Sequence, residues 1–181
     1  MVASTPAVSP MRVTVVMPLR DDWASAAELI RRLDRTLAAY PCILSVLLVD
    51  DGSVQPHAAA DFQANFSVVR SIRIIRLRRN LGHQRAIAIG LVQATRAGSC
   101  DAVLVMDADG EDTPDGALQL LRVFSEVHHG AKAIFAERSR RTESLVFKLS
   151  YKSYKVLHRL LTGVSVRVGN FSVFPAAYLS T

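Results

Sequence analysis

The feature that most constrains the fold is a series of short apolar runs separated by helical and turn segments. Five runs are rich in β-branched and aliphatic side chains: residues 12–19, 43–50, 72–78, 102–107 and 132–137. Continuous apolar runs are typical of strands buried on both faces of a parallel sheet, with helices covering those faces. The sequence therefore predicts an α/β fold, Rossmann-like, with a mostly parallel sheet and helices on both faces.

Three helices are predicted between these strands. The first follows apolar residues spaced three and four apart from Ala26 to Tyr40, and the second covers about 82–97. The third follows the fourth strand, with Pro114 as its first residue. Their boundaries are marked by proline, glycine and a capping threonine: Pro41, Gly98, Thr113 with Pro114, and Gly130.

The length of 181 residues predicts one domain, assigned to residues 12–181, after a flexible tail at 1–11. No apolar run reaches the ~20 residues that span a bilayer. Residues 1–10 lack the basic and apolar regions of a signal peptide, so a cytoplasmic location is expected. Cys42 and Cys100 are expected to be reduced thiols.

The net charge of +6 is unevenly distributed. Residues 138–167 contain eight Lys or Arg and one acid, Glu143, while the rest of the chain is close to neutral. A local excess of this kind favours a local anionic partner over a general nucleic-acid coat, although a solvated cationic helix face also fits it.

Polar residues follow each predicted strand, where ligands bind in parallel sheets. They are Arg20 and Asp22 after the first, Asp50 and Asp51 after the second, Asn80 after the third, Asp107 and Asp109 after the fourth, and Arg138 after the fifth. Because the carboxyl ends of parallel strands meet at one edge, most of the candidate chemistry is expected there.

The acidic stretch "MDADGED" after the fourth strand is typical of a site for a hard divalent cation, which takes oxygen ligands. An EF-hand is excluded, because Asp112 stands where that loop requires glycine. A phosphatase-type DxD nucleophile is disfavoured, since Glu111 stands where a small hydroxyl residue is expected. Acids that suit a helix dipole would explain Asp112 but not Asp107 and Asp109, which precede the cap.

Four motifs then resemble the family 2 glycosyltransferases of GT-A fold, from about Arg12 to the C-terminus. They are "MPLRDD", "LVDDGS", "NLGHQRAIAIGL" and "MDADGEDTP", in the family's order. The segments "ERSRRTESLVFKLSYKSYKVLHRLL" and "GNFSVF" resemble the polyprenyl-phosphate (dolichyl-phosphate mannose synthase-like) branch. The chain departs from the family at Arg20, where an aromatic residue is usual, and at Asn170, where an aspartate is usual. Relatives continue past residue 181, so we expect this domain to be either complete or truncated at its C-terminus.

The resemblance implies a metal-dependent hexosyltransferase that inverts the transferred sugar and acts in cell-wall biogenesis. The donor would be a UDP- or GDP-sugar, and Mg²⁺ or Mn²⁺ would bind at Asp109 and Asp107. The implied catalytic residues are Asp107, Asp109, Arg138 and Arg141. The implied nucleotide contacts are Pro18, Arg20, Asp22, Asp50, Asp51, Asn80, Gly82, His83 and Asp107. For His83, a contact to phosphate and a structural role in the turn are both open.

The acceptor is expected to be a polyprenyl phosphate held by Arg138 and Arg141, or else a sugar hydroxyl. A hydroxyl would need a carboxylate base, for which Glu111, Asp112 and Glu143 are candidates. Basic residues recur on one face of a predicted helix at 142–161, which fits either peripheral contact with the inner face of a membrane or packing on the sheet. No nucleic-acid partner is expected. A nucleotide-sugar-binding module without turnover is the remaining alternative.

Overall fold

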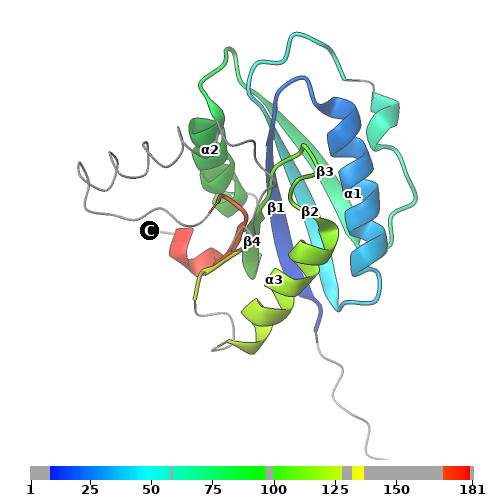
Figure 1. The fold of residues 1–181 in the computed structure, drawn as a ribbon, viewed down its shortest axis with the longest axis vertical. Coiled ribbons are helices and arrows are strands. Elements are labelled where there is room, and N and C mark those ends of the chain that lie inside the picture. The colour runs from blue at the N-terminus through cyan, green and yellow to red at the C-terminus, as the bar shows by residue number, and fades with distance from the viewer. Residues whose placement is uncertain (1–8, 58, 97–99, 128–131, 137–168, 180–181) are drawn as a thin grey trace, which may run out of the picture.

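The computed structural model describes residues 9–57, 59–96, 100–127, 132–136 and 169–179. Within these residues the sheet has six strands in the order β3-β2-β1-β4-β6-β5 (Figure 1). The strands are β1 (Met11–Leu19), β2 (Cys42–Asp50), β3 (Val69–Arg76), β4 (Ala102–Val105), β5 (Ile134–Phe135) and β6 (Ser172–Pro175). The helices are α1 (Trp23–Leu37), α2 (His83–Arg96) and α3 (Pro114–Glu126), with 3-10 turns at Ala59–Phe62 and Ala176–Leu179.

Four strands are parallel, as the continuous apolar runs predict. β1 pairs with β2 on one side and β4 on the other, and β2 pairs with β3. Residues 13–17 of β1 are almost completely inaccessible to solvent apart from Thr14, which is 6% exposed. The carboxyl ends of these four strands therefore meet at one edge of the sheet.

Helices cover both faces of the sheet, which confirms the predicted layers. Apolar residues of α1 and α3 pack with one face in a cluster that includes Ile30, Leu33 and Leu121. On the other face α2 packs through Ala86, Ile87 and Ala94 against β1, β2 and β4 (Figure 1). Gly90 of α2 lies so close to β1 that an added Cβ would lie 2.4 Å from Val16 Cγ1, so α2 is tightly seated on the sheet.

The start of α3 confirms the predicted cap. Thr113 precedes the helix in an extended conformation and its Oγ1 accepts a hydrogen bond from the Gly116 backbone N–H, while Pro114 occupies the first turn. The predicted stops at Gly98 and Gly130, and the predicted helix at 142–161, lie outside the described residues.

The last part of the sheet differs from the prediction. The expected strand at 132–137 is only two residues long within the described part of the chain, and it pairs with β6 rather than with a parallel neighbour. β6, which the apolar pattern did not predict, lies between β4 and β5 and runs antiparallel to both. Because β6 is reversed, its first residues lie at the edge where the parallel strands end.

Smaller differences at strand ends have a physical reason. β1 ends at Leu19 as predicted, and Pro18 is tolerated within it because β4 pairs only with Val13–Val16, so no ladder partner on that side needs a donor at Pro18. β3 begins at Val69, three residues before the predicted start, and all of its residues after Val69 are exposed or only partly buried. That exposure reflects its position at the edge of the sheet.

Candidate functional site

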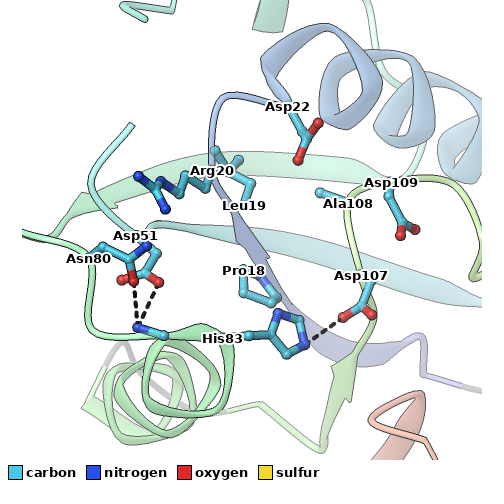
Figure 2. Close-up of a pocket in the computed structure, with 11 residues that line it drawn as sticks. Pro18, Leu19, Arg20, Asp22, Asp51, Asn80, His83, Asp107, Ala108 and Asp109 are labelled. Atoms are coloured by element: carbon cyan, nitrogen blue, oxygen red, sulfur yellow. Dashed lines mark hydrogen bonds and ion pairs between the residues drawn. The ribbon is translucent and has the colours of Figure 1, made fainter. Parts of the chain in front are cut away.

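A pocket of about 380 Å³, called the rim pocket below, opens at the carboxyl ends of the parallel strands. Its lining comes from the segments that follow β1, β2, β3 and β4: Pro18, Leu19, Arg20, Asp22, Asp51, Asn80, Gly82, His83, Asp107, Ala108 and Asp109 (Figure 2). Nine of these were singled out from the sequence, and only Leu19 and Ala108 were not. Arg138 and Arg141 lie outside the described residues.

Asp51 connects two of the segments that line the pocket. Its two carboxylate oxygens accept hydrogen bonds from the backbone N–H groups of Leu81 (2.6 Å) and Gly82 (2.9 Å). Asn80 Oδ1 also accepts from Gly82 N–H (2.8 Å). These bonds position the loop before α2, and Asp51 still lines the pocket with its remaining acceptor capacity.

Asp50 does not line the pocket. Its side chain is fully buried, Oδ1 accepts a hydrogen bond from Ser53 N–H (2.7 Å), and Oδ2 lies 3.2 Å from Arg76 Nε. Burial of this carboxylate is tolerated because the guanidinium compensates its charge. The predicted contact of Asp50 with a nucleotide therefore has no support from the geometry, whereas a structural role in the turn after β2 does.

His83, the first residue of α2, contacts residues from two other elements. Its Nε2 lies 3.2 Å from Asp107 Oδ1 and 2.9 Å from Asn170 Nδ2, and Gln84 Nε2 donates to Asn170 Oδ1 (3.0 Å). Asn170 precedes β6 and reaches this edge because β6 is reversed. An amide nitrogen can only donate, so Nε2 must be unprotonated to accept from Asn170 and protonated to donate to Asp107. The two contacts therefore compete for one ring nitrogen.

The acidic motif after β4 divides into a structural part and an exposed part. Asp112 is buried, and its Oδ2 accepts a hydrogen bond from Asp107 N–H (2.8 Å), which holds the loop closed. Asp109 is exposed, and its Oδ1 accepts from Glu111 N–H (2.8 Å). Gly110 has a φ of +86°, so the chain turns sharply just after Asp109. The turn leaves the Asp109 carboxylate at the pocket.

The donor set fits a divalent cation that is shared with a ligand. Asp107 and Asp109 supply hard oxygen atoms in one pocket, which suits Mg²⁺ or Mn²⁺. Within the described residues, no group of three or more His, Cys, Asp or Glu could hold a metal ion alone. Mg²⁺ commonly binds through one or two carboxylates together with substrate phosphates, so the remaining ligands would come from a bound phosphate and water.

The turn after β1 presents one cation and one anion to the pocket. Asp22 occupies the N-cap position of α1 but makes no side-chain capping hydrogen bond, although aspartate at this position usually caps. Its carboxylate lines the pocket instead. Arg20 is exposed and lines the same pocket; in Figure 2 its guanidinium lies toward Asp51 and Asn80. The turn therefore orients both side chains for a ligand.

The fold and the rim pocket define the chain as a GT-A glycosyltransferase domain. It belongs to the family described as glycosyl transferase family 2, whose model matches residues 14–180. Solved structures share the fold. Mannosyl-3-phosphoglycerate synthase from Rubrobacter xylanophilus superposes with a TM-score of 0.63 at 20% identity, over 93% of this chain and 54% of that chain. Glucosyl-3-phosphoglycerate synthase from Mycobacterium tuberculosis, in complex with UDP, superposes with a TM-score of 0.58 at 16% identity, over 92% and 57%.

Curated relatives share a higher identity. An undecaprenyl-phosphate 4-deoxy-4-formamido-L-arabinose transferase from Salmonella choleraesuis is 28% identical over 167 residues, which are 92% of this chain and 48% of the relative. The chain therefore spans about half the length of the curated relatives it matches. Among the described residues, no helix has both the length and the apolar character needed to cross a bilayer.

Proposed function

We propose that this chain binds a nucleoside-diphosphate sugar in the rim pocket and transfers its sugar to a polyprenyl phosphate, with Mg²⁺ or Mn²⁺ as the cofactor. The observation that carries the proposal is the convergence of Asp22, Asp51, Asp107 and Asp109, from three separate loops, on one pocket at the carboxyl end of a parallel sheet. Four carboxylates around one cavity suit a ligand that offers hydroxyl and N–H donors at one end and a metal-bridged phosphate at the other.

The donor would lie across the pocket. The N–H groups of the base and the hydroxyls of the ribose are donors, so they suit the carboxylates of Asp51 and Asp22 and the amide oxygen of Asn80. The diphosphate is an acceptor and suits the part of the pocket where His83 stands at the amino end of α2. An anion at a helix N-terminus meets free backbone N–H groups and a favourable dipole.

Asp109 and Asp107 would hold the metal ion. When bound, the ion would act as a Lewis acid that offsets the negative charge developing on the departing nucleoside diphosphate. The residues of the chain orient the ligand: Asp112 holds the Asp107 backbone, and Glu111 N–H holds one oxygen of Asp109. Asp107 and Asp109 are thereby held in position by the chain itself.

The acceptor assignment is supported by the names of the curated relatives, which are undecaprenyl-phosphate sugar transferases. A phosphate oxygen is already an anion and needs no strong general base. Direct attack of that oxygen on the anomeric carbon would invert the sugar in a single displacement. Arg138 and Arg141 would hold the acceptor phosphate, since guanidinium groups match its oxygen atoms.

Two other functions were open from the sequence. Membership of a glycosyltransferase family argues against a phosphatase-type hydrolase. A nucleotide-sugar-binding module without turnover is the second candidate, because binding requires only the pocket at the carboxyl ends of the strands. Turnover separates this module from the transferase.

The test is a transfer assay with the full chain, polyprenyl phosphate in detergent, Mn²⁺, and sugar-labelled UDP- and GDP-hexoses. We expect label to move into the lipid fraction with at least one donor, and the Asp109→Ala variant to lose this transfer. Retention of all label on the nucleotide, with nucleotide binding intact, would instead support the binding module. An Asp115→Ala variant is the matched control, because Asp115 is an exposed acid in the first turn of α3 that does not line the pocket.

A further inference from the structure

We infer that Asp21 is a positioning residue: its side chain couples the loop after β1 to the loop after β2, and through that loop to the loop before α2. The inference deepens the proposed function and rests on it for the identity of the ligand. Arg20 and Asp22 flank Asp21 and line the pocket, whereas Asp21 itself does not.

The backbone at Asp21 is unusual. Its φ is +60°, the one positive value among non-glycine residues in the described part of the chain. A left-handed conformation is unfavourable for a residue with a Cβ, and glycine would adopt it without that penalty. A strained conformation persists where its surroundings hold it, and such residues concentrate at functional sites. The turn therefore retains an aspartate although a glycine would suit its backbone better.

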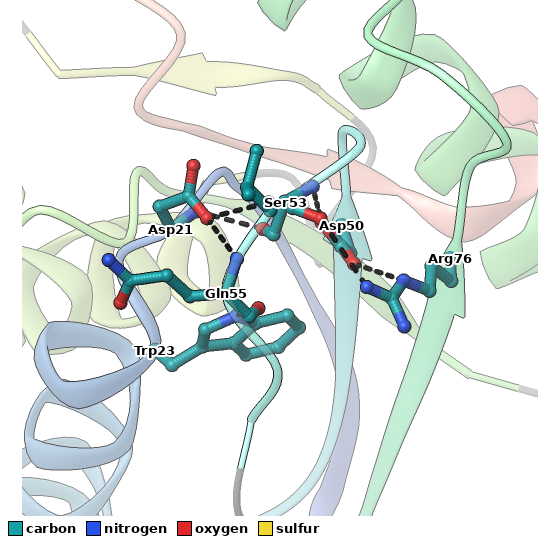
Figure 3. A network of polar contacts seen from close by, with 7 residues as sticks. Asp21, Trp23, Asp50, Ser53, Gln55 and Arg76 are labelled. Atoms are coloured by element: carbon teal, nitrogen blue, oxygen red, sulfur yellow. Dashed lines mark hydrogen bonds and ion pairs between the residues drawn. The ribbon is translucent and has the colours of Figure 1, made fainter.

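The Asp21 side chain explains why. Its Oδ1 accepts hydrogen bonds from the backbone N–H groups of Val54 (2.8 Å) and Gln55 (2.9 Å), and its own N–H donates to Ser53 Oγ (2.8 Å). Three consecutive residues of the loop after β2 are thus tied to one residue of the loop after β1 (Figure 3). Trp23 Nε1 adds a bond to the Gln55 carbonyl oxygen (3.0 Å).

The same loop is held from its other side by Asp50 and Arg76. Ser53 N–H donates to Asp50 Oδ1 (2.7 Å), and Arg76 Nη2 donates to the Ser53 carbonyl oxygen (3.3 Å) (Figure 3). Val54, at the tip, is 81% exposed. Since Val54 has so little packing around it, its backbone at the tip is held by the hydrogen bond to Asp21 Oδ1.

The loop in turn positions the next segment of the pocket. Asp51 accepts from Leu81 and Gly82 N–H, and Gly52 packs against the backbone of Asn80. A continuous chain of contacts therefore leads from Asp21 through residues 51–55 to the start of α2. Loss of the Asp21 carboxylate is expected to loosen three of the four loops that line the pocket, those after β1, β2 and β3, although Asp21 itself does not line it.

Three substitutions separate positioning from stability. Asp21→Asn keeps an acceptor oxygen and tolerates the left-handed conformation, so nucleotide affinity should stay within about threefold of the unmodified protein. Asp21→Gly relieves the backbone but removes the acceptor, so affinity should fall roughly tenfold while the Tm changes by only about 2 °C. Asp34→Asn is the matched control. The Asp34 carboxylate also accepts hydrogen bonds from three backbone N–H groups, those of residues 67–69, but it does so at the amino end of β3, far from the pocket.

The variants are compared by calorimetric titration with UDP and with GDP in Mn²⁺, and by amide hydrogen exchange without nucleotide. We expect faster exchange at Leu81 and Gly82 in Asp21→Gly and unchanged exchange there in Asp34→Asn. Unchanged protection of these two amides in Asp21→Gly overturns the inference whether or not any nucleotide binds. An equal loss of affinity in Asp21→Asn and Asp21→Gly overturns it as well, because the charge itself would then be the requirement. Failure of the unmodified protein to bind either nucleotide refutes the proposed function alone.

Discussion

Gly52→Ala should be among the most damaging single-methyl additions in this protein. Gly52 has a φ of +76°, and a Cβ built there would lie 2.7 Å from Asn80 N and 2.9 Å from the Arg79 carbonyl carbon. Both atoms belong to the backbone, so no rotation of a side chain can relieve the contact. The loops after β2 and β3 would have to separate by roughly 0.5–1 Å to restore ordinary contact distances.

Two costs combine in this variant. The left-handed backbone costs a residue with a Cβ about 1–2 kcal/mol. Overpacking against the backbone typically costs about 1–3 kcal/mol. The free energy of unfolding should therefore fall by about 2–5 kcal/mol, and the separation should also break the hydrogen bonds from Leu81 and Gly82 to Asp51.

Gly110→Ala is the matched control for the steric part. Gly110 has a φ of +86°, but a Cβ there would meet nothing within 4 Å. Only the backbone cost of about 1–2 kcal/mol should remain. Urea unfolding of both variants gives the difference directly. If the two glycine variants differ by less than about 0.5 kcal/mol, the close approach of the two loops is wrong.

Three further predictions concern titration, reactivity and the acceptor. Burial acts to raise the pKa of Asp34, but hydrogen bonds from the backbone N–H groups of residues 67–69 outweigh burial and hold that pKa below its usual value. Asp34→Asn should therefore lower the free energy of unfolding by about 1–3 kcal/mol at neutral pH, measured by urea unfolding. This difference between the two proteins should vanish as the pH falls through the lowered pKa of Asp34. Burial raises the pKa of the Cys42 thiol to about 11. At neutral pH, iodoacetamide should therefore alkylate Cys100, which is partly exposed, and should leave Cys42 unmodified until the protein unfolds. Mass spectrometry of the two cysteine peptides measures both alkylation rates, and equal rates in the folded protein would contradict the prediction. Combined Arg138→Ala and Arg141→Ala substitution should spare nucleotide affinity yet abolish transfer to polyprenyl phosphate in a labelled-donor assay, and loss of nucleotide binding would instead assign these arginines to the donor.

Much of the fold could be predicted because its strands carry a strong local signal. Residues 13–19 of β1 and 43–49 of β2 are apolar except for Thr14 and Ser45, and burial on both faces of a parallel sheet demands such a composition. The cap at Thr113 was equally local, since threonine is a preferred N-cap residue and proline a preferred first helical residue. The position of the rim pocket could be predicted from these elements, because parallel strands bring their carboxyl ends together.

The parts that could not be predicted depend on contacts distant in sequence. β6 is four residues long and is defined by antiparallel pairing with β4, about 70 positions earlier in the chain, which leaves no periodicity to detect. Asp50 and Asp51 are adjacent identical residues, yet one faces Arg76 and the other faces the pocket, because successive side chains at a strand end point to opposite sides. Asp21 was overlooked because its role depends on backbone groups more than thirty residues away.

Calorimetric titration of the full chain with UDP and with GDP, each with and without Mn²⁺, tests the central claim most directly. The claim is that the rim pocket binds a nucleoside diphosphate through a metal ion at Asp109. At least one nucleotide should bind roughly tenfold or more tightly with Mn²⁺ than without it, a difference of about 1.4 kcal/mol, and Asp109→Ala should remove that difference. Equal affinity with and without Mn²⁺ in the unmodified protein, or a full metal effect in Asp109→Ala, would contradict the account.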